Sequence, residues 1–261
     1  MLKNKIVPLK YADSIVPYID IDIDEQGISK SRILMLDILA ANNWKHPIYF
    51  TGGSHDDEEY IWLKDYLQLD GTAYKFVPMK TSNKDKSAFD MGHIDSERLY
   101  SKMIKWDWDI MSNPTIYLDI ETRKNSVTLR NNLIRLADVL IQENKFVKAE
   151  QILDLSIEKM PVERYGHYGM VLGYVESYYM INKPEKARKL AKLLESKFKE
   201  NLLYYSQFDE KLLDKVFDEI ETNVLMYKNI VDVTSKYDEK NATKMMEDFN
   251  SHIQLFKNIL E

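Results

Sequence analysis

The chain has 261 residues, of which 44% are hydrophobic and 30% charged, so it is a globular protein with room for one large or two ordinary domains. Its formal net charge of -6 argues against a nucleic-acid-binding protein, which needs a basic face. The absence of cysteine excludes disulfides, thiolate catalysis and cysteine metal ligands. No apolar run reaches the roughly 18 residues of a membrane span, and the first residues lack the hydrophobic stretch of a signal peptide.

The first part of the chain begins with a strand pattern followed by a helix pattern. Residues 18–24 alternate apolar and acidic side chains, which is the period of a half-buried strand. Ser29 suits the N-cap of an apolar-rich helix that Asn42 and Asn43 would end. Residues 47–51 form a short apolar run with a leading proline, which predicts a second strand.

The same alternation continues to about residue 106. A helix after Ser54 is expected to carry Ile61 to Leu67, and its first turn holds the acidic residues 56–59. A turn at Asp70–Gly71 leads into a predicted strand at residues 72–77. A further helix is expected near residues 96–106, followed by an irregular connection over 107–125. This order predicts an α+β or α/β domain with a small mixed or parallel sheet and flanking helices.

The second part reads almost entirely as helix and contains a repeat. Residues 144–149 match residues 182–187 at an offset of 187 − 149 = 38. The spacing of large and small residues around the first copy is that of a tetratricopeptide helix pair, although the usual repeat is about 34 residues. We therefore divide the chain into an α/β domain over residues 1–125 and a tetratricopeptide-like helical-repeat domain over residues 126–261.

Acidic clusters raise the possibility of a metal site. Asp20, Asp22 and Asp24 would lie on one strand face, but about 7 Å apart, which favours a solvated face over shared ion binding. The cluster from His55 to Glu59 is better explained as helix-start charge. The five histidines show no zinc-binding spacing, so we expect no metal and no cofactor.

Other motifs have a structural and a functional interpretation. Residues 52–54 could bind phosphate at a helix start, but the P-loop lysine is missing and a tight turn is favoured. The tryptophans at 106 and 108 could stack on sugars, but core packing is commoner. Gly166, Gly169 and Gly173 are predicted to share one helix face in close contact with another helix.

No catalytic residue can be assigned from the sequence. There is no nucleophile elbow, and nothing singles out a pair among the 42 acidic residues. We therefore expect that this chain alone is not an enzyme.

Tyrosines near the repeat are the predicted binding residues. At 100° per residue they cannot all lie on one helix face, so some are expected to be exposed in a groove that binds a peptide or partner. Burial of all of them under neighbouring helices is the alternative. These residues are Tyr165, Tyr168, Tyr174, Tyr178 and Tyr179.

Several segments together carry a family resemblance over roughly residues 6–205. They are residues 28–30, 35–40, 42–44, 47–50, 62–71, 74–78, 90–95, 117 and 121–126. In order and combination they resemble the C-terminal soluble part of large bacterial multi-pass membrane proteins of unknown function. That family is related to membrane protein O-mannosyltransferase-like glycosyltransferases.

The resemblance implies that a membrane-embedded half, absent from this chain, carries the sugar transfer. It also implies an extracytoplasmic, periplasmic location as part of a longer membrane protein. This part would be a non-catalytic accessory domain whose partners are a polypeptide acceptor or protein and the parent membrane domain. It would bind no nucleic acid and would not itself insert into the membrane. The alternatives are a purely structural protein-interaction module unconnected with glycans and, third, an independent hydrolase or transferase.

Overall fold

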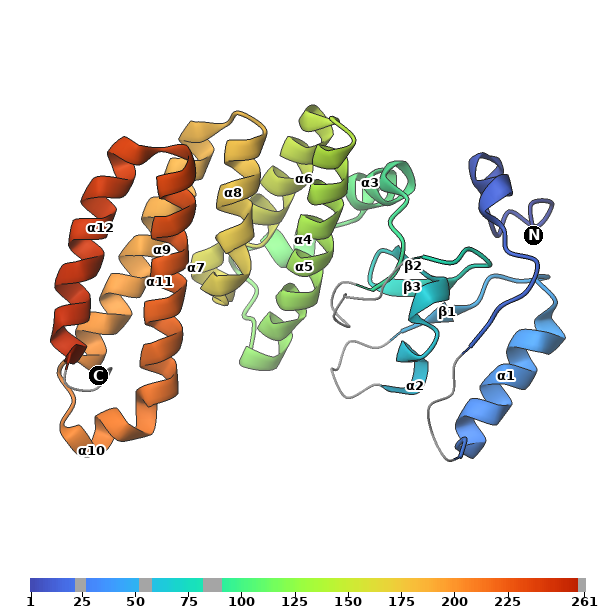
Figure 1. Ribbon diagram of the computed structural model, residues 1–261, viewed down its shortest axis with the longest axis horizontal. Coiled ribbons are helices and arrows are strands. Elements are labelled where there is room, and N and C mark those ends of the chain that lie inside the picture. Colours follow the sequence, from blue (N-terminus) through green and yellow to red (C-terminus); the bar gives the residue numbers. More distant parts are fainter. Residues whose placement is uncertain (22–26, 52–57, 82–90, 258–261) are drawn as a thin grey trace. The chain divides into compact units, whose positions relative to one another are not determined.

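The chain forms two compact units in the computed structural model, which describes residues 1–21, 27–51, 58–81 and 91–257 (Figure 1). Unit 1 comprises Met1–Trp108 with Asn131–Val139, and unit 2 comprises Asp109–Arg130 with Leu140–Glu261. The middle of helix α5 (Ile120–Gln142) belongs to unit 1 and its two ends belong to unit 2. The predicted domain boundary, between residues 125 and 126, lies within this helix. A small sheet near the N-terminus followed by a mostly helical region confirms the predicted fold class.

The sheet of unit 1 has three strands in the order β1-β3-β2, and both pairings are antiparallel. A single parallel bridge joins Gln68 of β2 to His93, whose backbone nitrogen donates to the carbonyl oxygen of Leu67 at 2.7 Å. The described elements of this unit before α5 are 3-10 helix η1 (Leu9–Ser14), α1 (Lys30–Asn42), β1 (Tyr49–Phe50), α2 (Glu58–Ile61), 3-10 helix η2 (Lys64–Tyr66), β2 (Leu67–Asp70), β3 (Ala73–Phe76) and α3 (Ser96–Lys105).

Helix α1 begins and ends where the sequence predicts. The Ser29 side chain accepts a hydrogen bond from the backbone nitrogen of Arg32, and Asn43 ends the helix in the left-handed conformation at φ 43°. The predicted strands at 47–51 and 72–77 are present in shorter form as β1 and β3, and the predicted helix near 96–106 is α3.

Two local predictions are wrong in the described residues. Residues 18–21 form no strand, since the backbone nitrogen of Asp20 donates to the hydroxyl of Tyr66 at 3.0 Å rather than to a neighbouring strand. Leu67 does not continue a helix but begins β2, because the hairpin turn after Asp70 pairs β2 with β3. Gly71 makes that turn possible at φ +89°, a conformation that side chains disfavour. The predicted residues 22–24 and 52–57 lie outside the described part.

A buried carboxylate joins three elements of unit 1. The Asp70 side chain at the end of β2 is fully buried. Arg98 of α3 donates to both of its oxygens, at 3.3 and 2.9 Å, and Lys102 Nζ lies 2.6 Å from Oδ1. Tyr49 of β1 donates its hydroxyl at 3.0 Å. Burial acts to raise the pKa of Asp70, but the hydrogen bonds from Arg98 and Lys102 outweigh it and hold this pKa below the usual value.

The N-terminal segment is fastened to the sheet by a buried lysine. Ile6 and Val7 pack with Val77 and Met79 in one apolar cluster. Lys75 of β3 is buried and donates from Nζ to the carbonyl oxygen of Ile6 at 2.6 Å. Burial, with the nearby positive charge of Arg98, lowers the pKa of Lys75.

The middle of α5 completes the core of unit 1. Asn132 Nδ2 donates to the carbonyl oxygen of Gly71 at 3.0 Å, and the Arg135 guanidinium donates to that of Met91 at 2.6 Å. Both polar side chains are buried and capture backbone oxygens that the sheet leaves unpaired. The same part of the helix buries Leu133, Leu136 and Ala137.

Unit 2 is built of helices that pack on their sequence neighbours. Helix α8 lies against α9, α9 against α11, and α11 against α12, as Figure 1 shows. Its elements after α5 are α6 (Phe146–Lys159), α7 (Val162–Tyr165), 3-10 helix η4 (Tyr168–Val171), α8 (Leu172–Met180), α9 (Pro184–Tyr205), α10 (Glu210–Leu213), 3-10 helix η5 (Asp214–Val216), α11 (Phe217–Tyr237), α12 (Glu239–Ile253) and 3-10 helix η6 (Gln254–Phe256).

The sequence repeat at 38 residues is also a repeat of backbone geometry. Asn144 and Asn182 both take the left-handed conformation at φ 58°. The nitrogens of the next residues, Lys145 and Lys183, each donate 2.8 Å back to the last turn of the preceding helix, to Leu140 and Tyr178. The two turns therefore reverse the chain in the same way before α6 and α9.

The predicted irregular connection over 107–125 contains the short helix α4 (Asp109–Ser112), and α5 begins in it at Ile120. Arg164 of α7 donates to the carbonyl oxygens of Met111, Asn113 and Ile116. The Tyr165 hydroxyl donates to that of Met111 at 2.8 Å. This segment of unit 2 is held by specific contacts.

The glycines at 166, 169 and 173 do not share one helix, contrary to the prediction. Gly166 ends α7 at φ +72°, which interrupts the helix, and Gly173 is exposed on α8. Gly169 does mark a close approach, because a Cβ there would lie 2.4 Å from Met226 Cε of α11.

We expect Asp70→Asn to destabilise unit 1 by about 2 kcal/mol at pH 7, because it removes the buried carboxylate that accepts charge-assisted hydrogen bonds from the partly exposed Arg98 and Lys102. Since the pKa of Asp70 is depressed on folding, its stabilising effect is present above the unfolded value near 3.9 and disappears as the pH falls through the folded value. In thermal melts, the difference in melting temperature between wild type and variant should therefore narrow from pH 5 to pH 3. The exposed control Asp13→Asn should change the free energy of unfolding by less than about 0.5 kcal/mol.

The repeated turns give a second prediction. Replacing Asn144 or Asn182 by Ala should cost about 1 kcal/mol in the free energy of unfolding, because alanine disfavours positive φ. Replacement by Gly should be neutral or stabilising at both positions. Denaturant titration of the four variants, with exposed Gln142→Ala as control, measures this. An alanine variant as stable as its glycine counterpart would contradict the turn geometry.

Candidate binding groove

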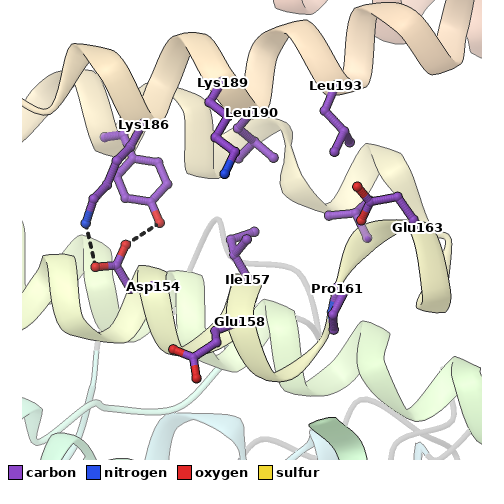
Figure 2. Close-up of a pocket in the computed structure, with 11 residues that line it drawn as sticks. Asp154, Ile157, Glu158, Pro161, Glu163, Lys186, Lys189, Leu190 and Leu193 are labelled. Carbon is purple, nitrogen blue, oxygen red and sulfur yellow. Dashed lines mark hydrogen bonds and ion pairs between the residues drawn. The ribbon is translucent and has the colours of Figure 1, made fainter. Parts of the chain in front are cut away.

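A hollow of about 440 Å³ lies in unit 2 between α6 and α7 on one side and α9 on the other. Figure 2 shows Lys186, Lys189, Leu190 and Leu193 along α9, facing side chains of α6 and the turn that follows it. These α9 positions are spaced three and four residues apart, so they share one helix face. The opposite side is lined by Asp154, Ile157, Glu158, Pro161, Val162 and Glu163.

Apolar side chains form the surface between the two charged rims. Leu190 is buried, whereas Ile157 of α6 and Leu193 of α9 are only half-buried. Pro161, which lines the hollow, follows the end of α6 and is the N-cap of α7. Half-buried aliphatic side chains in a concave surface can gain hydrophobic contact from a ligand.

One end of the hollow is closed by a charged network. The Tyr178 hydroxyl donates to Asp154 Oδ1 at 2.9 Å, and Lys186 Nζ donates to Asp154 Oδ2 at 2.6 Å and to Glu150 at 2.7 Å. Hydrogen bonds from Lys186 and then Lys183 lower the pKa of Glu150. Burial, with the charge of Asp154, raises the pKa of Tyr178 well above its usual value, so this hydroxyl stays a donor.

A second hollow of about 480 Å³ extends the first along α9. Glu163, Lys189 and Leu193 line both. The extension adds Lys192 and Lys197, whose Nζ lies 5.8 Å from the centre of the Tyr168 ring. We call the two hollows together the α9 groove.

The α9 groove has walls of opposite charge. Glu158 and Glu163 stand on the side of α6 and α7, and Lys189 and Lys192 stand on the side of α9. Within the described ranges, Lys189 and Lys192 form no ion pair. Their charges are therefore available to a ligand.

The structure places the five predicted tyrosines in different surroundings. Tyr165, Tyr174 and Tyr178 are buried, and only Tyr168 and Tyr179 are partly exposed. The Tyr174 hydroxyl bonds to Ser156 and to the carbonyl oxygen of Arg130, both at 2.9 Å, which is a structural role. Tyr178 and Tyr168 border the α9 groove.

Tyr179 belongs to a separate hollow of about 330 Å³ between α9, α11 and α12. Its ring stacks on Tyr237 with centroids 5.2 Å apart. Two of the cations around it already have a carboxylate partner: Arg188 pairs with Asp238 at 2.5 Å and Lys199 with Asp248 at 2.5 Å. This hollow therefore offers less to a ligand than the α9 groove.

The remaining sequence motifs do not add to the groove. Trp108 is buried and donates from Nε1 to the carbonyl oxygen of Met103 at 3.0 Å, which fits core packing, while Trp106 is exposed. Across the described residues, no three histidine or acidic side chains lie close enough to hold a metal ion. Asp22 and Asp24, like residues 55–57, lie outside the described part.

The basic wall of the groove was not predicted. Its only sequence signal is the row of lysines at 186, 189, 192 and 197, which on a charged helix reads equally well as a solvated face.

Residues 1–98 match the family described as TMEM260-associated domain 2. The first third of the chain is thus similar to a domain associated with a membrane protein. This agrees with the sequence resemblance in linking the chain to a membrane protein. Neither the curated proteins nor the solved structures contain a match to this chain. None of the helices in the described part is long and apolar enough to cross a membrane.

The different roles of the tyrosines lead to a prediction. Tyr174→Phe removes a buried hydroxyl and with it the hydrogen bonds to Ser156 and to the carbonyl oxygen of Arg130, so it should cost about 1–2 kcal/mol in the free energy of unfolding. Tyr168→Phe, at a partly exposed position, should cost less than about 0.5 kcal/mol. Chemical denaturation followed by circular dichroism compares them, and equal losses would show that burial does not distinguish these residues.

Proposed function

We propose that this chain is a non-catalytic accessory part of a membrane protein and that its α9 groove binds an extended polypeptide segment. The supporting observation is the groove itself, an open channel with an apolar surface between an acidic and a basic wall. Its walls are packed helices, which hold a binding surface at low entropic cost.

The shape and chemistry of the groove suit a peptide. An extended chain alternates its side chains to opposite sides, so successive residues would meet the α9 lysines and the α6–α7 glutamates in turn. Aliphatic contacts with Ile157 and Leu193 would supply affinity, and the charged walls would orient the peptide. Stacked helices with a concave surface are a common setting for such binding.

We propose that peptide binding takes place beside a membrane protein. The match of residues 1–98 to TMEM260-associated domain 2 supports association with a membrane protein. Together with the sequence resemblance, it leads us to propose an extracytoplasmic location beside the parent membrane domain of a glycosyltransferase-like protein. In that arrangement the membrane part would carry the chemistry, and this chain would present the polypeptide acceptor or a partner protein.

A second candidate function is a tetratricopeptide-like interaction module without any connection to glycans. The repeated turns at Asn144 and Asn182 support this alternative as well. The two functions differ in the fate of the bound peptide, since only an acceptor would be glycosylated by the parent protein.

Binding by the groove can be tested with fluorescent peptides in which lysine and glutamate alternate around aliphatic residues. We expect micromolar binding to the intact chain, measured by anisotropy. Leu193→Glu should weaken it about tenfold, because a carboxylate in the apolar part of the groove is costly to cover. Lys189→Glu should weaken it less, because it reverses only one exposed charge of the basic wall.

The matched control is Leu203→Glu, the same change at an exposed leucine of the same helix outside the groove. It should bind as the wild type does. Equal losses in both leucine variants, or no binding of any such peptide, would refute the proposed site.

A further inference from the structure

Helix α1 of unit 1 is apolar and yet exposed. Eight of its 13 residues are apolar, and none of the 13 is buried. Ile33, Leu34 and Ile38 are 53%, 63% and 61% exposed. Figure 1 shows α1 at the margin of unit 1. A helix with this composition is normally covered, so the exposed surface points to a partner.

The contact that α1 makes with the rest of unit 1 shows which side of the helix is exposed. Arg32 lies with its guanidinium carbon 6.0 Å from the centre of the Trp62 ring, which places that residue toward unit 1. At 100° per residue, Lys30, Leu34 and Asp37 point roughly the opposite way, and Ile33, at 100° from Arg32, lies beside them. All four are exposed. Their spacing of three and four residues is that of a helix–helix contact.

Two charges on this side have no partner within the part of the chain that the structure describes. Neither Lys30 nor Asp37 forms an ion pair or a side-chain hydrogen bond with a described residue. They lie seven residues apart, about 10 Å along the helix axis, so they cannot pair with each other. Between them lie Ile33 and Leu34, at equal distance from the two charges.

We propose that the exposed side of α1 binds α1 of a second copy of this chain, with the two helices antiparallel. Because the charges are placed symmetrically about Ile33 and Leu34, Lys30 of each copy then meets Asp37 of the other. Ile33 of each copy meets Leu34 of the other at the centre. The interface is self-complementary, as a two-fold dimer requires.

A lipid surface is the less suitable cover for this side. Asp37 lies on the exposed side together with Ile33 and Leu34, where insertion into a bilayer would desolvate a carboxylate without a partner. The antiparallel arrangement gives the same carboxylate a lysine. A helix of 13 residues is about 20 Å long, so the pair is a small interface and the dimer should be weak and concentration-dependent.

Charge reversal on the full chain tests the pairing by sedimentation equilibrium. We expect reversible dimerisation of the wild type at micromolar concentrations. Lys30→Asp alone and Asp37→Lys alone should each weaken it about tenfold, since both inter-helix pairs become repulsive. An equimolar mixture of these two variants should associate again, because every contact in the mixed dimer joins opposite charges. The double variant carrying both changes should dimerise as the wild type does.

The control is Glu221→Lys, the same kind of charge change at an exposed position of α11 in unit 2, which should leave the association unchanged. Far-ultraviolet circular dichroism checks that each variant is folded. A wild type that stays monomeric up to about 1 mM, or single variants that associate as the wild type does, would overturn the proposal. So would a monomer that floats with anionic lipid vesicles and loses this binding on Leu34→Glu, since lipid would then cover the helix.

Discussion

The sheet of unit 1 is too small to bury a core by itself, and this constraint governs the N-terminal part of the chain. β1 has two residues and β2 and β3 have four each. Sheets of this size need a helix against them for stability. The middle of α5 meets this need, because Asn132 and Arg135 bind backbone oxygens that lie beyond the strand pairings.

Buried charged groups in unit 1 join its strands to their neighbours, beside the apolar core. Asp70 joins β2 to α3 and β1, and Lys75 joins β3 to the segment at Ile6. Each buried charge is costly without its partners, so these contacts define which elements lie together more sharply than apolar packing alone would.

In unit 2 the packing of neighbouring helices creates the site. The turns at Asn144 and Asn182 send the chain back in the same way, and α9 then passes α6 and α7 at a distance that leaves the α9 groove open. The charges of its walls come from helices distant in sequence. The exposed helix α1 is a separate surface in the other unit, so the peptide-binding and self-association proposals stand or fall independently.

The sequence by itself determined features that depend on local chemistry. The cap at Ser29, the turn at Gly71 and the 38-residue repeat are each properties of a few neighbouring residues, and all are present in the structure. It also determined the fold class, because strand and helix periods differ. Tertiary structure decided the rest. Residues 67–70 have a pattern that fits helix or strand, and only pairing with β3 makes them a strand. Burial of Tyr174, exposure of α1 and the opposed charges of the groove depend on which helix lies beside which, and no local pattern encodes that.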